Sequence, residues 1–394
     1  MLRFSTAGES HGESLVGWLS GLPAGLAIDV DFLNHQLWRR QQGYGRGGRM
    51  KIEHDEVHIL SGVRNGVTIG SPIAVLIANQ DWKNWEQALP VEEGDPEQFR
   101  KVKSPRPGHA DLAGALKYNF PEARYVLERA SARESTMRVA LGAFAKLLLR
   151  EFGIEVLSHV TAVGAAALDP LEISWQQVWQ LRHQKEIVLN CADPDVEIKM
   201  KEEVDKVLKT GDSVGGVFEV RAHNVPPGLG SYINWDERLD AQLAAAVMSL
   251  QAVKAVEIGS GITAAAAPGS SVHDEITYEH ERNEDRHTSF RRSANRAGGL
   301  EGGVSNGEDI IVRGYLKPIS TLRRPLESVD FETRQQVKAA YERSDVCVVP
   351  AAGVGGEAMV ALTLARAALE KFGGDSMGET RRNYLGYAQQ LRNF

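Results

Sequence analysis

The chain has 394 residues, and its 45 Lys+Arg against 52 Asp+Glu give a formal net charge of −7. This length allows one large domain or two ordinary ones, and 42% hydrophobic residues supply a sizeable core. The acidic balance argues against a nucleic-acid-binding protein, so an anion site requires local clustering of arginine. Two cysteines far apart in the chain exclude a disulfide framework and a cysteine-based zinc site, and they fit a reducing cytosol.

We expect a soluble cytoplasmic protein without a membrane anchor. The N-terminal residues lack the apolar stretch of a signal peptide. The most apolar segment, residues 351–369, is interrupted by glycines, a glutamate and an arginine, so we do not expect it to span a membrane.

In the first third of the chain, apolar periodicity predicts strands at 15–22, 57–61 and 73–78. Asp31 is expected to cap a helix that runs to about Gln42, and a flexible Gly-Arg loop follows at 43–49. Ser131 and Glu134 have the form of a capping box, so we expect a helix from about Ala132.

Further along, residues 150–215 alternate helix and strand patterns. We expect a helix at 236–251, strands at 255–258 and 310–316, and a closing helix at 357–372. Residues 279–296 are highly charged and are expected to form a mobile surface loop, with a tight glycine-rich turn after it at 298–307. Without a regular βαβ rhythm, the pattern favours an α+β class and one domain over 1–394.

Two histidines, His11 and His109, lie in short polar, glycine-rich segments with arginines nearby. Neither is in an apolar run, as a core histidine would be. Histidine titrates near neutrality and therefore suits proton transfer. Paired with arginine, these histidines point to a polyanionic substrate whose leaving group must be protonated.

Three arginine-containing segments are candidate anion sites. Four arginines lie within residues 39–49 together with four glycines, and glycine lets the backbone approach a ligand that arginine binds through two hydrogen bonds. This segment is equally compatible with a solvated basic turn. Residues 128–133 place two arginines at a predicted helix N-terminus, which favours phosphate, although Ser131 is expected to cap the helix in either case.

The third segment, residues 343–345, contains Arg343 and Asp345, and taken alone it favours a surface ion pair over an anion site. The segment 317–321 after the glycine-rich turn is a weaker candidate. Cys347 is expected to pack rather than react. There is no H-E-x-x-H, Walker A, G-x-S-x-G or strand-linked G-x-G-x-x-G pattern, which disfavours zinc proteases, P-loop NTPases, α/β-hydrolases and a Rossmann domain.

Taken together, five segments resemble the chorismate synthase family, in the family's order and over nearly the whole chain. They are Gly8-Glu9-Ser10-His11-Gly12 with Gly21-Leu22-Pro23, Arg106-Pro107-Gly108-His109-Ala110-Asp111, residues 128–136, residues 302–307, and residues 343–347 with Gly356-Glu357-Ala358. The resemblance implies a β-α-β sandwich fold and a homotetramer. It also implies a phosphate-eliminating lyase that converts 5-enolpyruvylshikimate 3-phosphate to chorismate, the last step of the shikimate pathway toward aromatic amino acids. This anti 1,4-elimination needs reduced FMN but involves no net redox change.

The resemblance also implies roles for particular residues. His11 protonates the leaving phosphate, His109 balances the charge of the reduced flavin, and Asp345 works with the flavin's central-ring nitrogen to remove the substrate proton. Substrate-binding residues are Arg40, Arg46, Arg49, Arg106, Arg133 and Arg343. Cofactor-binding residues are Arg129, Ala130, Ser131, Gln251, Ala252, Gly302, Lys317, Pro318, Ile319, Ser320, Thr321 and Arg343. The loop at 279–296 is expected to close over the site when substrate binds.

Two other functions remain open at this point. The first is a flavin- or NADPH-dependent oxidoreductase, since the family has bifunctional members that reduce their own flavin; Arg40 and Arg46 would then contact NADPH. No appended reductase domain is evident, so an external flavin reductase is the default. The second is an RNA- or anion-binding protein that uses the Gly-Arg loop, which the acidic net charge counts against.

Overall fold

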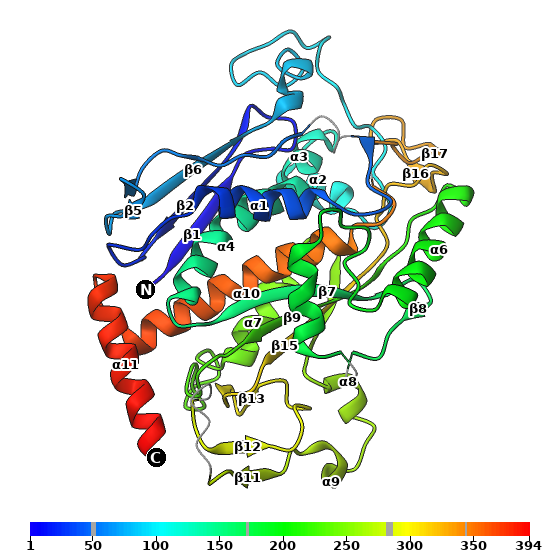
Figure 1. The fold of residues 1–394 in the computed structure, drawn as a ribbon. Coiled ribbons are helices and arrows are strands. Elements are labelled where there is room, and N and C mark those ends of the chain that lie inside the picture. The colour runs from blue at the N-terminus through cyan, green and yellow to red at the C-terminus, as the bar shows by residue number, and fades with distance from the viewer. Residues whose placement is uncertain (49–52, 171–172, 281–286, 343–344) are drawn as a thin grey trace.

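Two antiparallel sheets form the frame of the molecule (Figure 1). The computed structural model describes residues 1–394 except 49–52, 171–172, 281–286 and 343–344. The first sheet has the order β1-β2-β6-β3, with β1 (Arg3–Ala7), β2 (Ser14–Ser20), β6 (Ile73–Ala78) and β3 (His58–Ile59). The second has the order β10-β15-β9-β7-β8, with β10 (Val253–Ile258), β15 (Ile310–Leu316), β9 (Gly216–His223), β7 (Glu155–Val163) and β8 (Ala166–Ala167).

Helices α4 (Ser135–Arg150) and α10 (Val349–Phe372) pack against each other between these sheets. Strand β2 alternates, with Leu15 and Leu19 buried and Trp18 exposed, so one face of the first sheet covers α4. Helix α10 lies on β7 and β9 of the second sheet, and Figure 1 shows it crossing the centre of the molecule. The largest cluster of buried apolar side chains among the described residues extends from Leu2 to Met377.

Small residues let these layers approach closely. A Cβ at Gly142 of α4 would lie 2.4 Å from the Cβ of Ala358, and one at Gly356 would lie 2.5 Å from the ring of Phe218. The glycines that interrupt the apolar segment of the sequence are therefore contact points of a continuous helix. This helix begins eight residues before the predicted start at 357 and ends, as expected, at Gly373.

Within the described part of the chain, α10 alone is long and apolar enough to cross a membrane by length and composition. Its most apolar window is 89% buried in the protein, as expected for the core helix of a globular domain. The predicted helix at 357–372 is present but is not the last one, because α11 (Met377–Asn393) follows it, capped by the side chain of Ser376.

Two predicted helix starts need correction. Helix α1 (Val30–Gln41) is capped by Asp29, whose carboxylate accepts from the N–H of Phe32, while Asp31 lies in the first turn. Ser131 caps as predicted, but it caps the 3-10 turn η3 (Ala132–Glu134), and α4 begins at Ser135.

The remaining helices are α2 (Asp111–Tyr118), α3 (Arg124–Ala130), α5 (Trp175–Gln180), α6 (Pro194–Thr210), α7 (Leu239–Met248), α8 (Gly261–Ala264) and α9 (Gly269–Val272), with 3-10 turns η2 (Gln80–Asn84) and η5 (Leu181–His183). The remaining strands form hairpins: β4 (Val63–Arg64) with β5 (Val67–Thr68), β11 (Ile276–Tyr278) with β12 (Phe290–Arg292), β13 (Leu300–Glu301) with β14 (Val304–Ser305), and β16 (Glu327–Val329) with β17 (Gln336–Lys338). The predicted strand at 310–316 has the bounds of β15.

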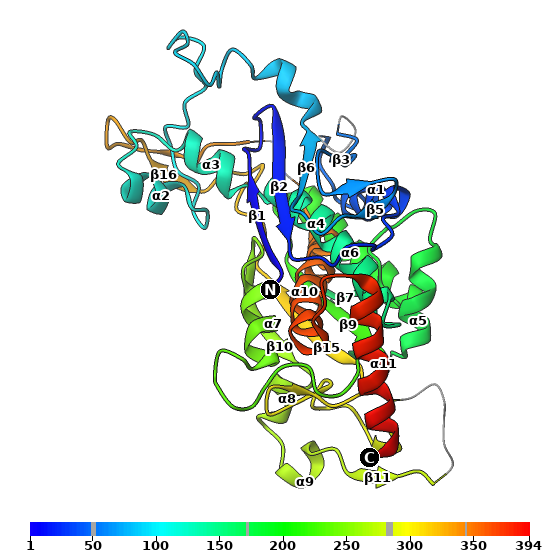
Figure 2. The same ribbon diagram turned by 90° about the vertical axis from the view of Figure 1, so that its left-hand side faces the viewer.

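The predicted mobile loop at 279–296 is only partly described, because residues 281–286 lie outside the described residues. Its C-terminal part contains β12, and Glu279 forms an ion pair with Arg291 at 2.9 Å. Figures 1 and 2 show β11 at the end of the molecule opposite α2 and α3.

Candidate active site

His11 is fixed by a buried carboxylate and an aromatic ring. It follows β1, and Glu128 of α3 accepts hydrogen bonds from its backbone N–H at 2.7 Å and its ring Nδ1 at 2.9 Å. The imidazole stacks on Trp85 with ring centroids 4.0 Å apart. Burial opposes ionisation of Glu128, but the hydrogen bonds and charge of His11, with Arg124, hold its pKa below the ordinary value. The carboxylate is thus charged and keeps Nδ1 directed toward itself.

His109 has a similar partner. Its Nδ1 lies 2.5 Å from Asp111 Oδ1, and Asp111 is fully buried in the first turn of α2. Arg106 donates to the same carboxylate through Nε at 2.8 Å and to Thr321 Oγ1 at 2.9 Å. Burial opposes ionisation of Asp111, but His109 and Arg106 hold its pKa well below the ordinary value. The two histidines predicted as acid–base groups are therefore both held by ionised carboxylates.

Arg40 is the centre of a cationic cluster. Its Nε donates to Ser135 Oγ at 3.0 Å and its Nη2 to the carbonyl of Ala132 at 2.7 Å. Its Nη1 is buried and has no hydrogen-bond partner in the described part of the chain. Burial, together with the charges of Arg46 and Arg133, lowers the pKa of Arg40 to about 9 despite two nearby aspartates. A buried cation with an unused donor, beside other cations, is suited to bind an anion.

Asp345 contacts the Gly-Arg loop at Gly47, although 298 residues separate the two in sequence. Its Oδ1 accepts from the N–H of Gly47 at 2.6 Å, and its Oδ2 lies 3.1 Å from Arg46 Nη1. A Cβ at Gly45, whose φ is +83°, would lie 3.3 Å from Cys347, so the loop packs tightly on this segment. Cys347 is fully buried, and burial raises the pKa of its thiol to about 11, which fits packing rather than nucleophilic chemistry.

Arg133 is buried among acceptors from the protein itself. Its Nη1 lies 2.6 Å from Asp55 Oδ1, its Nε donates to Asn79 at 2.9 Å, and its Nη2 lies 3.5 Å from Glu53. The protein's own acceptors therefore occupy much of this guanidinium, although its Nη2 is buried without a hydrogen-bond partner in the described part of the chain.

The predicted cofactor-binding segments at 251–252 and 317–321 lie side by side. The N–H of Lys317 donates to the carbonyl of Ala252 at 3.0 Å, where β15 leaves its partner β10. The ammonium of Lys317 donates to the carbonyl of Gly108, next to His109. Ser213 donates to the carbonyl of Ile319 at 2.6 Å and so fixes the middle of the segment.

Glu134 links these segments to residues 129–131. It accepts from Gln251 at 3.0 Å and from Thr6 at 2.6 Å, and Arg129 in turn donates to Thr6 Oγ1 at 3.0 Å. Because Glu134 is used in this way, it does not complete the capping box that the sequence predicts. Ser131 donates to Ser10 Oγ at 3.1 Å, which places it beside the His11 turn.

Gly302 lies apart from this group. It is in the β13–β14 hairpin, where the carbonyl of Gly303 accepts from Leu239 at the start of α7, whereas Gln251 follows the end of that helix. The 10 residues of α7 span about 15 Å. Arg49 and Arg343 lie outside the described residues.

Sequence reasoning missed several residues of this region: Glu128, Asp111, Trp85, Glu134 and Asp55. Glu128 and Asp111 stood in the motifs already singled out, and a carboxylate two residues after His109 was a usable signal. Nothing in the local sequence marks Trp85 or Asp55, since only the fold brings them to the site.

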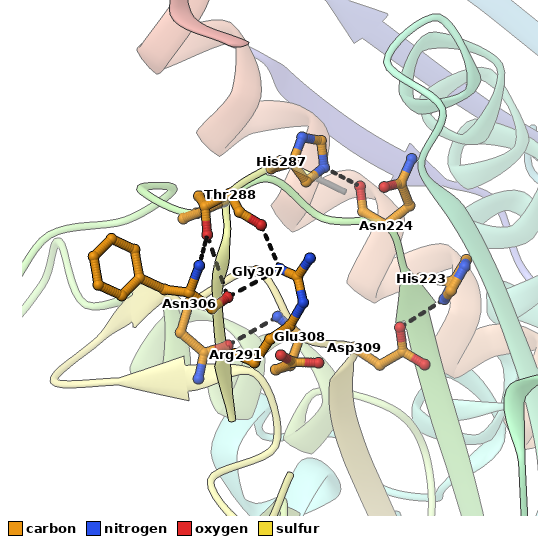
Figure 3. Close-up of a pocket in the computed structure, with 11 residues that line it drawn as sticks. His223, Asn224, His287, Thr288, Arg291, Asn306, Gly307, Glu308 and Asp309 are labelled. Atoms are coloured by element: carbon orange, nitrogen blue, oxygen red, sulfur yellow. Dashed lines mark hydrogen bonds and ion pairs between the residues drawn. The ribbon is translucent and has the colours of Figure 1, made fainter. Parts of the chain in front are cut away.

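A separate cavity of about 200 Å³ is lined by residues from the end of β9, from the segment 287–291 and from the segment 306–309 that precedes β15 (Figure 3). His223 points toward Asp309 at 2.7 Å, and His287 contacts the carbonyl of Asn224 at 3.2 Å. None of the predicted site residues lines it.

Two carboxylate-held histidines together with a buried arginine cluster are typical of an enzyme that performs acid–base chemistry on an anionic substrate. The family model for chorismate synthase matches residues 2–369. The chorismate synthases of Koribacter versatilis and Acidobacterium capsulatum are 69% and 66% identical to the chain over 394 residues, with 100% of each chain covered. A crystal structure of chorismate synthase superimposes with a TM-score of 0.79 at 40% identity, covering 100% of this chain and 99% of that chain.

The chain therefore belongs to the chorismate synthase family. Its reaction is the elimination of phosphate from 5-enolpyruvylshikimate 3-phosphate to give chorismate, which makes it a lyase of the shikimate pathway.

Proposed function

We propose that the chain carries out this elimination with reduced FMN bound along residues 129–131, 251–252 and 317–321, between His109 and the arginine cluster. Two features support this placement. The three segments are joined by hydrogen bonds through Glu134 and Lys317. They also offer the cationic and hydroxyl donors of Arg129, Ser131 and Lys317, which suit a phosphate-bearing flavin. When bound, reduced FMN supplies electron density that eases a difficult carbon–oxygen cleavage.

The arginine cluster orients the substrate and stabilises the departing phosphate. Arg40 keeps a buried donor without a partner in the described part of the chain, and this observation carries the proposal most directly. A phosphate or carboxylate oxygen there would satisfy that donor and reduce the repulsion among Arg40, Arg46 and Arg133.

His11 donates a proton to the leaving phosphate. Glu128 orients the ring through Nδ1, and stacking on Trp85 fixes the ring plane. His109, held by Asp111, balances charge on the cofactor side of the site, and Asp345 takes part in removing the substrate proton.

Several further features belong to the same proposal. The arrangement of α4 and α10 between two sheets supports a β-α-β sandwich in a single domain. We also propose a cytoplasmic homotetramer whose flavin is reduced by an external reductase. If the chain instead reduces its own flavin, Arg40 and Arg46 contact NADPH.

The test is an anaerobic assay with 5-enolpyruvylshikimate 3-phosphate and chemically reduced FMN, in which phosphate and chorismate are measured together. Equal amounts of both products, absent when FMN stays oxidised, support the proposal. Turnover that is equal with oxidised FMN, or without FMN, would contradict it. Consumption of NADPH without added reductase would show that the chain reduces its own flavin and needs no external reductase.

A further inference from the structure

A second cavity, of about 170 Å³, opens beside α1, α4, the start of β7 and the α5–η5 segment. It is separate from the candidate active site, because none of the predicted catalytic, substrate-binding or cofactor-binding residues lines it. Helix α1 nevertheless connects the two sites. Arg39 lines this cavity, whereas the next residue, Arg40, donates a hydrogen bond to Ser135 in the candidate active site.

The floor of this cavity carries a buried surplus of positive charge. Arg39 and Lys146 both contact Glu357, with Arg39 Nη2 at 2.7 Å from Oε1, and all three side chains are buried. Two cations thus share one carboxylate. Lys146 donates to Glu357 and to Gln36 at 3.0 Å, which uses two of the three donors of its ammonium.

The rim adds further positive charge. Arg150 is paired with Glu155 at 3.1 Å, whereas the guanidinium of Arg182 lies over the ring of Trp179 and donates to His183. Burial, with smaller contributions from the charges of Arg39 and Lys146, lowers the pKa of His35, which also lines the cavity, although Glu357 opposes this.

The walls between floor and rim are apolar. Phe32, Val156, Leu157 and Trp179 contribute aromatic and aliphatic surface. A cavity of about 150 Å³ with apolar walls accommodates a benzene ring, so this space is large enough for a single ring with one small substituent.

We propose that this cavity binds a small organic anion that has one carboxylate and a flat apolar body. The carboxylate would accept from Lys146 and offset the surplus charge of the floor, and the ring would contact Trp179 and Phe32. A divalent inorganic anion fits less well, because it would bring no apolar surface to these walls.

Benzoate is a suitable probe, with inorganic phosphate and benzylamine as comparisons. The protein contains seven tryptophans, and 5-fluorotryptophan labelling makes each visible by ¹⁹F NMR. The Trp179→Phe variant assigns the resonance of the cavity, Trp85→Phe assigns that of the candidate active site, and exposed Trp235 serves as a remote reference.

We expect benzoate, at up to about 10 mM, to shift the Trp179 resonance with saturation, while phosphate and benzylamine do not. Lys146→Met should weaken this binding by about tenfold or more, and Arg182→Ala is the second variant if Lys146→Met does not fold. Arg64→Ala, an exposed arginine on β4, should leave it unchanged.

Three outcomes would overturn the proposal. The first is no shift of Trp179 with benzoate in the folded protein. The second is a shift of the Trp85 resonance alone, which would show that benzoate occupies the arginine cluster instead. The third is an equal or larger response to phosphate or to benzylamine, which would exclude a flat apolar carboxylate as the preferred ligand.

Discussion

Glu357 is expected to be one of the most important charged residues for stability, and Glu357→Gln tests this. The substitution keeps the shape of the side chain but removes the carboxylate of α10 that Arg39 and Lys146 share. Glu357 also accepts from the N–H and the hydroxyl of Ser158, at 2.8 and 2.6 Å. A glutamine has one carbonyl oxygen, so it cannot serve all these donors.

The magnitude follows from two independent estimates. Burial opposes ionisation of Glu357, but Arg39 and Lys146 outweigh it and lower its pKa from 4.5 to about 2. At about 1.4 kcal/mol per pKa unit, this shift corresponds to about 3 kcal/mol of stability at neutral pH. Removing one partner of a buried ion pair costs about 3–5 kcal/mol by experience with other proteins, which agrees.

The pH dependence has a definite sign. Because the pKa is lower in the folded state, the stabilisation is complete above about pH 4.5 and is lost as the pH falls toward 2. The difference in unfolding free energy between wild type and Glu357→Gln should therefore shrink over that range.

Urea denaturation at matched protein concentration, at neutral pH and at several acidic pH values, measures this difference. Glu370→Gln, an exposed position on the same helix, is the control and should change stability by less than about 0.5 kcal/mol. A Glu357→Gln protein within about 1 kcal/mol of wild type at neutral pH, or a difference that grows on acidification, would refute the reasoning.

The remaining predictions concern the active site and are measured by steady-state turnover with reduced FMN. His11→Ala and His109→Ala should each lower kcat by about a hundredfold or more, while FMN binding, followed by flavin fluorescence, is unchanged. Wild-type rates in both variants would contradict the roles assigned to these histidines. Glu128→Gln keeps a hydrogen-bond acceptor for His11 but loses its charge, so kcat should fall by about tenfold with KM nearly unchanged, whereas a change in KM alone would argue against a positioning role. Arg46→Ala should raise KM, and because the Arg46 side chain is only 9% exposed, salt should change this penalty little; a penalty that disappears as salt is added would show that Arg46 acts only at long range.

The sequence predicted regular elements where periodicity is strong and local. Strand β15 has the predicted bounds because its short run of mostly apolar and β-branched residues, IIVRGYL, favours a buried strand. The start of α10 was missed because Gly353 and Gly356 look like helix breakers in sequence, and only their contacts with neighbouring elements show why glycine is needed there. The cap of α1 was placed two residues late because Asp29 and Asp31 are both acceptable caps locally.

In the candidate site as well, the sequence shows local motifs but does not show the contacts that only the fold creates. The motifs of His11, His109 and Arg40 are visible in sequence because each combines an uncommon residue type with glycine or arginine neighbours. Their partners Glu128 and Trp85 could not be assigned, since neither is a sequence neighbour of His11. The separation of Gly302 from Gln251 by the length of α7 is likewise a property of the fold.

Residues that contact one another in the candidate active site are far apart in sequence, and this affects when the site can form during synthesis and folding. His11 and Glu128 are 117 residues apart, Thr6 and Glu134 are 128 apart, and Gly47 and Asp345 are 298 apart. Such distant pairs form slowly, because the chain loses the entropy of loop closure before the new contacts can stabilise it. During synthesis the arginine loop leaves the ribosome early, but it can meet Asp345 only when nearly the whole chain has emerged. A chain that ends before Asp345 therefore lacks the contact that holds the Gly-Arg loop, although the contacts of His11, His109 and Arg40 lie within its first 135 residues.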